Sequence, residues 1–325
     1  MTAMLLIGGA TPIMMDEFHR HFTVHVWDDI ADKDGFLASH GADIAAVATN
    51  GHDGVAPDIM AGLGNLKIIS CYGVGYDAID TSVATARGIM VTHTPIVLNN
   101  DVANTAIMLM LAVSRRLVHD HDWVCSGRWQ EQGNAPLTRS IEGAKVGIFG
   151  LGRIGQTIAR KLGAFACDIA YHTRTEKPDL PYRFYDDLTA MAKDVDYLIA
   201  ITPGDASTYQ KINREVIDAL GPDGTLINVG RGSVVDEDAL VAALEDGRLG
   251  GAGLDVFANE PHVPPALCKM DNVTLTPHVA SATVETRRAM GDLTIENLLR
   301  FFNDGSVTTP VPECAHMKVA PLRPQ

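Results

Sequence analysis

A glycine-rich turn at residues 150–155, Gly-Leu-Gly-Arg-Ile-Gly, restricts the fold of this chain more than any other feature. The turn follows the apolar run 145–149, which has the character of a buried strand, and it opens a helical segment. In such a unit the first glycine permits the tight turn, the second lets backbone approach a pyrophosphate, and the third allows close packing of helix on strand. The helix N-terminus attracts the phosphates. The predicted dinucleotide contacts are Gly150, Gly152, Arg153, Ile154 and Gly155.

The residues after the next strand-like run, 168–172, indicate which dinucleotide is bound. Proteins that bind NAD commonly end this strand with an acidic residue, which accepts hydrogen bonds from the ribose hydroxyls. Here the strand is followed by Thr173, Arg174 and Thr175. An arginine pairs with a 2′-phosphate, and the two threonine hydroxyls can add hydrogen bonds. We therefore predict NADPH as the preferred cofactor, while the nearby Glu176 keeps NADH possible.

Strand-like and helical segments alternate on both sides of the turn, which indicates an α/β protein. The strand-like runs are apolar on both faces, as expected for parallel sheets that helices cover on both sides. A chain of 325 residues has room for two domains of this kind. The runs are 4–7, 24–26, 45–48, 67–70 and 90–92, and then 145–149, 168–172, 197–201, 225–229, 253–256 and 273–275.

The last helical segment, at 281–302, indicates how the two domains are connected, because a helix this late in the chain can pack back on the first block. We predict two doubly wound parallel-sheet domains, with a Rossmann cofactor domain at 101–281 inserted in a flavodoxin-like substrate domain at 1–100 and 282–325. Apolar positions at helical spacing predict that one long helix begins the insertion and runs to about Gly127.

Charge and cysteine content exclude several classes of function. The formal net charge is −14, which argues against nucleic acid or an anionic membrane as a partner, since both require a basic face. The five cysteines are odd in number and lack Cys-x-x-Cys spacing, so neither a disulfide framework nor a metal site is expected. The first residues lack a basic signal-peptide region, and the longest apolar run, 106–113, is too short to span a bilayer. We expect a cytoplasmic protein with reduced thiols.

Three polar residues, Arg231, Glu260 and His278, each follow a predicted strand of the second block. Ligands of α/β sheets bind at the carboxyl ends of the strands, so these side chains are candidates for one site. Together they suit the reduction of a keto acid. A histidine can supply the proton that the ketone oxygen gains, a carboxylate can orient the imidazole, and an arginine can bind the substrate and polarise its carbonyl. Taken singly, His278 could be a structural histidine, Arg231 a member of an ion pair and Glu260 a solvated side chain.

The order of motifs along the chain resembles that of the D-isomer-specific 2-hydroxyacid dehydrogenase family. The resemblance covers nearly the whole chain, and within the family it is strongest toward the glyoxylate, hydroxypyruvate and hydroxyphenylpyruvate reductases. It is carried by Val74-Gly75-Tyr76-Asp77, by His93-Thr94-Pro95, by the glycine-rich turn, and by segments 228–232, 253–261 and 277–278. The loop at 202–207 departs from the common pattern.

The resemblance implies a role for each candidate residue. Arg231, Glu260 and His278 form the catalytic triad, and the backbone N–H groups of Val74 and Gly75 hold the substrate carboxylate together with Arg231. The product is a D-2-hydroxy acid, NADPH is the usual cofactor, and the long helix forms a homodimer surface. Further cofactor contacts are expected from Pro203, Thr208, Val229, Gly230, Asp255 and His278. From its place near a strand end, Asp255 could face the nicotinamide amide or be an ordinary strand-end carboxylate.

Two other functions stay open at this stage. Some proteins with this fold are NAD(H)-sensing corepressors, which would need an exposed peptide groove and extensions of the chain. Others are phosphoglycerate, formate or phosphite dehydrogenases, and the missing acidic NAD residue argues against the formate enzyme. The choice among glyoxylate, hydroxypyruvate and bulkier aryl pyruvates is also open, since no pattern in the sequence fixes the pocket.

Overall fold

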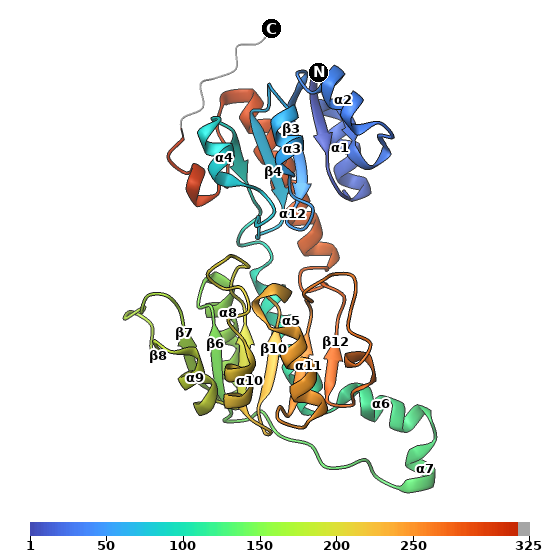
Figure 1. The fold of residues 1–325 in the computed structure, drawn as a ribbon, viewed down its shortest axis with the longest axis vertical. Helices are drawn as coiled ribbons and strands as arrows, with labels where there is room; N and C mark the ends of the chain where they lie inside the picture. The colour runs from blue at the N-terminus through green and yellow to red at the C-terminus, as the bar shows by residue number, and fades with distance from the viewer. Residues whose placement is uncertain (318–325) are drawn as a thin grey trace. The chain divides into compact units, whose positions relative to one another are not determined.

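A computed structural model describes residues 1–317 and divides the chain into two compact units (Figure 1). The first unit comprises Met1–Leu98 together with the residues from Thr283 onward, and the second comprises Asn99–Ala282. The second unit thus begins at residue 99, where we predicted 101, and ends at 282, where we predicted 281. The last part of the predicted substrate domain, 318–325, lies outside the described residues.

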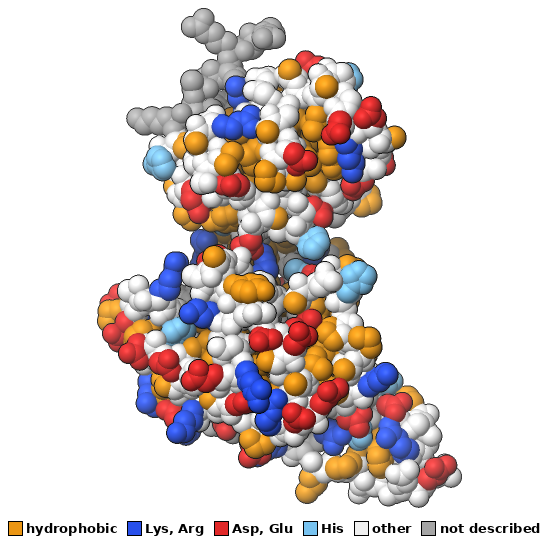
Figure 2. Space-filling view, viewed as in Figure 1, with side chains coloured by type: hydrophobic (Ala, Val, Ile, Leu, Met, Phe, Trp, Pro, Cys, Tyr) orange, Lys and Arg blue, Asp and Glu red, His pale blue; other side chains and the backbone are white. Residues whose placement is uncertain are grey.

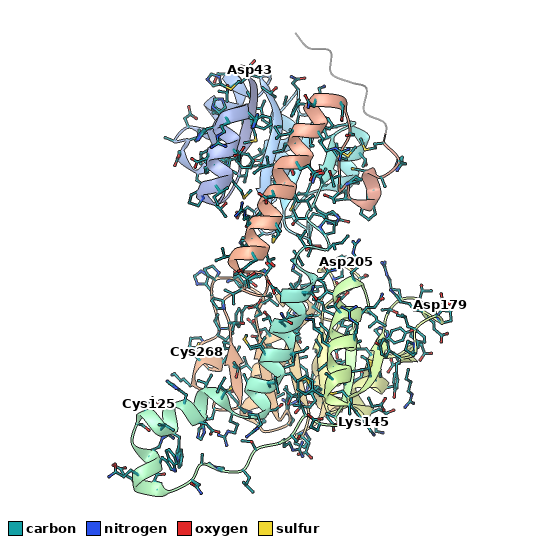
Figure 3. The ribbon with its side chains drawn as sticks, turned by 180° about the vertical axis from the view of Figure 1, so that it is seen from behind. Asp43, Cys125, Lys145, Asp179, Asp205 and Cys268 are labelled. Atoms are coloured by element: carbon teal, nitrogen blue, oxygen red, sulfur yellow. The ribbon has the colours of Figure 1, made fainter. Side chains whose placement is uncertain are left out.

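The first unit contains a five-stranded, all-parallel sheet in the order β2-β1-β3-β4-β5. This is the flavodoxin-like order, and the predicted fold class is confirmed. Figure 1 shows α3 and α4 in front of the sheet, and the view from behind in Figure 3 shows α12 covering the other face. The elements are β1 (Thr2–Leu6), α1 (Pro12–His21), β2 (Phe22–Val26), α2 (Lys33–His40), β3 (Ile44–Asn50), α3 (Pro57–Gly62), β4 (Ile68–Tyr72), α4 (Thr81–Ala86), β5 (Met90–Thr92) and α12 (Val284–Asp304).

Helix α12 returns the end of the chain to this first sheet. Its side chains Leu298 and Phe301 are buried together with Ile68 and Ile69 of β4, and the hydroxyl of Ser70 donates to the carbonyl oxygen of Thr294 (3.1 Å). Burial of apolar side chains of this size contributes about 1.5–3 kcal/mol each. The late helix therefore belongs to the core of the first unit, which is why the second unit is an insertion.

The second unit contains a seven-stranded, all-parallel sheet in the order β12-β11-β10-β9-β6-β7-β8. Counted within the unit, this is the Rossmann order 3-2-1-4-5-6 with one further strand at the edge, as the predicted class requires. Helices α9, α10 and α11 cover one face (Figure 1), and α5 and α8 cover the other (Figure 3). The elements after α7 are β6 (Lys145–Phe149), α8 (Arg153–Leu162), β7 (Asp168–His172), β8 (Arg183–Tyr185), α9 (Leu188–Asp194), β9 (Tyr197–Ala200), α10 (Arg214–Leu220), β10 (Thr225–Asn228), α11 (Glu237–Glu245), β11 (Gly251–Leu254) and β12 (Val273–Leu275).

The prediction of one long helix up to Gly127 is wrong. The segment forms α5 (Asn99–Ser114), α6 (Leu117–Cys125) and α7 (Arg128–Gln132), with Arg116 in the left-handed region at φ 49°. Helix α5 packs on the sheet and on α8, and its buried positions end at Val113 and Ser114. In α6 only His119 is buried, so the apolar stripe that favours a continuous straight helix stops where the sheet stops. No helix within residues 1–317 has the length and apolar character needed to cross a membrane.

Candidate active site

The glycine-rich turn connects β6 to α8 at the point where the strand order of the second sheet reverses. Gly150 adopts φ 104°, which favours glycine, and an added Cβ there would lie 2.9 Å from backbone atoms of Ile201 and Thr202. A Cβ at Gly155 would lie 2.2 Å from the carbonyl oxygen of Gly150. At Gly152, by contrast, a Cβ would meet nothing within 4 Å. The first and third glycines are thus required by packing, whereas the second borders open space.

This open space suits a pyrophosphate. Gly152 is the N-cap of α8 and offers no side chain to its first N–H groups, so these donors stay available to an anionic ligand. Arg153 is exposed and Ile154 partly buried at the first positions of α8. The residues of the turn therefore fit the dinucleotide that the sequence predicts.

The two glycines should respond differently to alanine. Gly155→Ala forces the helix and strand apart, and we expect the melting temperature to fall by about 2–10 °C. Gly152→Ala should leave the melting temperature of the free protein nearly unchanged, but its methyl group would occupy the space predicted for the pyrophosphate. We expect it to raise the dissociation constant of NADPH by about 10-fold or more, measured by fluorescence titration. Unchanged NADPH binding by Gly152→Ala would contradict the predicted position of the pyrophosphate.

The loop after β7 contains the predicted 2′-phosphate residues. The side chains of Arg174 and Thr175 are exposed, and the hydroxyl of Thr173 donates to the carbonyl oxygen of Thr175 (2.8 Å). The same loop brings a cation that sequence reasoning missed, because the Lys177 ammonium donates to the carbonyl oxygen of Leu151 in the glycine-rich turn (2.8 Å). A second cation near Arg174 makes this end of the site more basic, although the protein as a whole is acidic. The sequence signal that could have identified Lys177 is its position in the same loop as Arg174.

The loop after β9 contains Pro203 and Thr208. The buried Thr208 hydroxyl donates to the carbonyl oxygen of Pro203 (2.7 Å) and accepts from the N–H of Asp205 (2.9 Å), so it closes the loop on itself. Pro203 is exposed. The Ser207 hydroxyl, and less strongly the charge of Arg174, hold the pKa of Asp205 below its usual value. Thr208 therefore stabilises the conformation of this loop, whereas the exposed Pro203 can contact a ligand.

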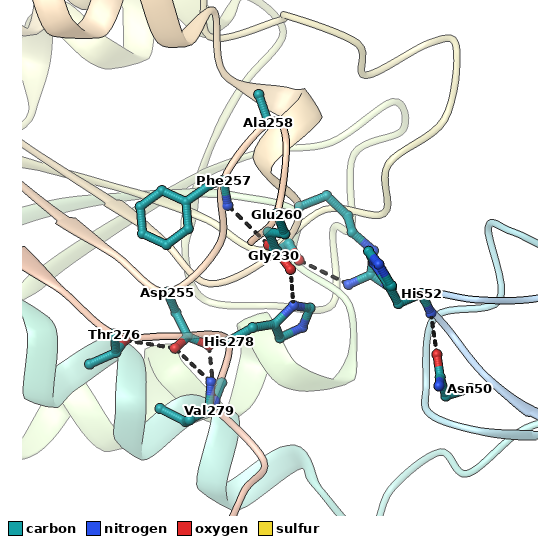
Figure 4. Close-up of polar contacts among 12 residues, drawn as sticks. Asn50, His52, Gly230, Asp255, Phe257, Ala258, Glu260, Thr276, His278 and Val279 are labelled. Carbon is teal, nitrogen blue, oxygen red and sulfur yellow. Dashed lines mark hydrogen bonds and ion pairs between the residues drawn. The ribbon is translucent and has the colours of Figure 1, made fainter. Parts of the chain in front are cut away.

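Arg231, Glu260 and His278 come from the carboxyl ends of β10, β11 and β12, which are neighbours in the sheet. The imidazole Nδ1 of His278 lies 2.7 Å from Oε2 of Glu260, and Oε1 of Glu260 accepts from the N–H of Phe257 (3.0 Å; Figure 4). A carboxylate only accepts, so Nδ1 carries the hydrogen and Nε2 is left for chemistry. The side chain of His278 is 45% exposed and that of Glu260 20%. A partly exposed imidazole held by a more buried carboxylate is the arrangement that general acid catalysis needs.

The turn that carries Arg231 is held by Asn228, which is 1% exposed. Its amide donates to the carbonyl oxygen of Arg231 (3.0 Å) and accepts from the N–H of Gly230 (3.1 Å). A Cβ at Gly232 would lie 1.9 Å from the backbone of Phe257, so this glycine allows the turn to pack beside the loop of Glu260. Val229 and Gly230 are both buried at the strand end. One guanidinium nitrogen of Arg231 donates to the carbonyl oxygen of Gly230 (2.9 Å).

Asp255 holds the loop that carries His278. Its side chain is fully buried, and its carboxylate accepts from the Thr276 hydroxyl (2.6 Å) and from the N–H groups of Val279 (2.9 Å) and Ala280 (2.9 Å; Figure 4). The N–H of His278 donates to the carbonyl oxygen of Asp255 (2.8 Å), and His278 adopts a left-handed φ of 52°. Such backbone persists where its surroundings fix it. The geometry thus supports a positioning role for Asp255, and its expected contact with the nicotinamide amide stays a prediction.

Val74 and Gly75 belong to the first unit, in the loop directly after β4. Both residues are partly exposed. Among the described residues, neither of their N–H groups donates to a protein acceptor. Two adjacent unpaired N–H groups in one loop can bind an anion. The described residues contain no group of three or more His, Cys, Asp and Glu side chains that could hold a metal ion.

Comparisons with known proteins agree on one family. Residues 107–280 match the model of the D-isomer specific 2-hydroxyacid dehydrogenase NAD-binding domain. The chain is 44% identical to glyoxylate/hydroxypyruvate reductase A of Arabidopsis thaliana, over 94% of this chain and 98% of that relative. It is 46% identical to hydroxyphenylpyruvate reductase of Plectranthus scutellarioides, over 88% and 90%. A solved NADPH-dependent glyoxylate/hydroxypyruvate reductase of Sinorhizobium meliloti, in complex with NADP and malonate, shares 46% identity at a TM-score of 0.91, over 98% of this chain and 100% of that one.

Proposed function

The chain belongs to the D-isomer specific 2-hydroxyacid dehydrogenase family, and we propose that it is an NADPH-preferring reductase of small 2-keto acids. Membership makes it an NAD(P)-dependent oxidoreductase that converts a keto acid to a hydroxy acid. The observation that carries the proposal is the His278–Glu260 pair beside the turn of Arg231, at three adjacent strand ends of the dinucleotide-binding unit. The relatives named above act on glyoxylate, hydroxypyruvate or hydroxyphenylpyruvate, so the substrate is expected among these acids.

In the proposed reaction a bound NADPH, held by the glycine-rich turn and Arg174, would supply the hydride that reduces the keto acid. The Arg231 guanidinium binds the keto acid and polarises its C2 carbonyl, and the N–H groups of Val74 and Gly75 are the proposed donors to the substrate carboxylate. His278 donates its Nε2 proton to the carbonyl oxygen. Glu260 keeps the imidazole oriented and stabilises its cationic form as the proton is exchanged. The D configuration of the product follows from the family.

An assay at 340 nm tests the proposal directly. The purified protein is offered glyoxylate, hydroxypyruvate, hydroxyphenylpyruvate and 2-ketogluconate, each with NADPH and with NADH. We expect oxidation of NADPH with at least one of these acids, and slower oxidation of NADH. Binding of reduced dinucleotide without turnover of any acid would overturn the proposal and favour a dinucleotide-sensing binding protein.

The preference for NADPH is proposed to depend on Arg174, supported by Thr173 and Thr175. Arg174→Ala removes a cation from the 2′-phosphate, and we expect kcat/KM for NADPH to fall about 10–100-fold while that for NADH changes little. Arg160→Ala, which removes an exposed arginine near the end of α8, is the charge-matched control and should leave both values unchanged. An unchanged NADPH/NADH ratio in Arg174→Ala would leave Lys177 as the candidate for this role.

We also propose a homodimer formed through the segment from α5 to α7. In Figure 1 α6 and α7 extend away from the sheet of the second unit, and Figure 2 shows hydrophobic side chains on their surface. Large hydrophobic side chains that stay exposed in the single chain favour burial against a second copy. Those in this segment are Met108, Leu117, Val118, Val124 and Trp129. Light scattering should give the mass of two chains.

The cytoplasmic location that we expected stays a proposal. It is supported by the five cysteines, none of which is joined to another, because reduced thiols are typical of the cytosol.

A further inference from the structure

We propose that His93 and Thr94, in the loop after β5, orient the two N–H groups of Val74 and Gly75 that bind the substrate carboxylate. The loop of Val74 follows β4, and β5 is paired with β4 in the sheet of the first unit, so the two loops leave adjacent strand ends. The inference rests on the proposed function, because it concerns the carboxylate site of that reaction. It assigns positioning residues that do not themselves contact the substrate.

In a trans peptide the C=O and the N–H point in opposite directions within one plane. The only cis peptide bond among the described residues is Glu260–Pro261, so both peptide units of interest are trans. The N–H of Val74 shares its plane with the carbonyl of Gly73, and the N–H of Gly75 shares its plane with the carbonyl of Val74. A contact that fixes either carbonyl therefore fixes the direction of the N–H on the opposite side.

The carbonyl oxygens of Gly73 and Val74 each accept a hydrogen bond from one of two consecutive residues, Thr94 and His93. The N–H of Thr94 donates to the carbonyl oxygen of Gly73 at 2.8 Å, and Nδ1 of His93 lies 2.9 Å from the carbonyl oxygen of Val74. Since a carbonyl oxygen only accepts, Nδ1 carries the hydrogen of this bond. The two N–H groups of Val74 and Gly75 are thus turned away from the loop of His93, and they stay available for an anion.

The imidazole of His93 is itself held in place. The residue is 5% exposed, and the ring of Tyr76 packs edge-on against it with 5.3 Å between centroids and 88° between planes. Burial and the neighbouring Glu313 raise the pKa of Tyr76 to about 12, so the phenol stays protonated and donates to that carboxylate (3.2 Å). The backbone of His93 is bonded to Thr309, whose hydroxyl donates to the His93 carbonyl at 2.6 Å. Nδ1 of His93, the donor that orients the Val74 peptide, therefore has little freedom to move.

Three variants of His93 separate a positioning role from a purely structural one. Asparagine keeps a donor at the place of Nδ1, glutamine moves the donor outward by one bond, and leucine removes it. Loss of one hydrogen bond to a charged group weakens affinity by about 10–100-fold. We therefore expect His93→Leu and His93→Gln to raise the KM for the keto acid and the inhibition constant of oxalate within that range. His93→Asn should stay within about threefold of the wild type, and in all three kcat should change less than KM and the dissociation constant of NADPH should be unchanged.

Thr309→Val is the control for stability, because it removes a hydrogen bond to the backbone of His93 without touching the imidazole. It should lower the melting temperature and leave KM near the wild-type value. Equal KM values for the asparagine and glutamine variants, or a KM in Thr309→Val as high as in His93→Leu, would overturn the inference. If His93→Leu fails to fold, the difference in KM between His93→Asn and His93→Gln still tests the inference. Failure of the wild type to reduce any keto acid would instead refute the proposed function.

Discussion

Replacing His278 with asparagine is expected to lower kcat by about 10²–10⁴-fold, with NADPH binding nearly unchanged. Asparagine tolerates the left-handed backbone that His278 adopts at φ 52°, whereas alanine would add strain there. Its amide can also donate to Glu260 in place of the imidazole Nδ1, which lies 2.7 Å from that carboxylate. The substitution therefore removes only the Nε2 proton donor. The loss of activity can then be assigned to proton transfer, because the loop itself is preserved.

The effect is measured as kcat at saturating keto acid and NADPH, with cofactor affinity from fluorescence titration. His262→Asn is the matched control, since it makes the same change at an exposed position near Glu260, and its kcat should equal that of the wild type. A His278→Asn enzyme that keeps more than about a tenth of wild-type kcat would show that another group delivers the proton. Lost NADPH affinity with retained turnover would assign His278 to cofactor binding alone.

The grouping of the three candidate catalytic residues could be predicted from the sequence because it depends on topology. Arg231, Glu260 and His278 each follow a strand, and adjacent parallel strands place their carboxyl ends side by side whatever the details of packing. Likewise, local sterics explain the glycines at positions 150 and 155, because a Cβ added at either position would lie within 3 Å of backbone atoms. Such features need only the order of strands and the geometry of one turn.

Other features could not be predicted, because they depend on contacts distant in sequence. The break between α5 and α6 arises where the sheet stops supporting the helix, and nothing in the residues around Arg116 marks that edge. The burial of Asp255 also depends on contacts that are distant in sequence. An acidic residue near a strand end suits a ligand contact as well as a bond to a neighbouring loop, and the sequence does not show that Asp255 bonds to residues 276, 279 and 280. The role proposed for His93 likewise depends on the position of its ring beside the Val74 carbonyl, which belongs to another loop.

The second large effect is expected from Arg231→Lys, which keeps the charge but loses the planar fork. We predict that kcat/KM for the keto acid falls about 10²–10³-fold. The guanidinium of arginine carries five N–H donors, and one nitrogen already donates to the carbonyl oxygen of Gly230 at 2.9 Å. A lysine ammonium is a single point, so it cannot keep that bond and also span the carboxylate and the C2 carbonyl of the substrate.

The separate changes in kcat and KM of Arg231→Lys distinguish binding of the carboxylate from polarisation of the carbonyl. If it only binds the carboxylate, the lysine variant should raise KM and keep kcat, because binding of substrate and transition state is weakened equally. If it also polarises the carbonyl, kcat should fall as well, since that interaction strengthens as negative charge develops on oxygen. We expect both changes, with the fall in kcat exceeding 10-fold. Arg214→Lys, at an arginine that is 74% exposed on α10, is the control and should change neither value. A lysine variant within fivefold of wild-type kcat/KM would mean that charge alone suffices, and the proposed two-point contact would then be wrong.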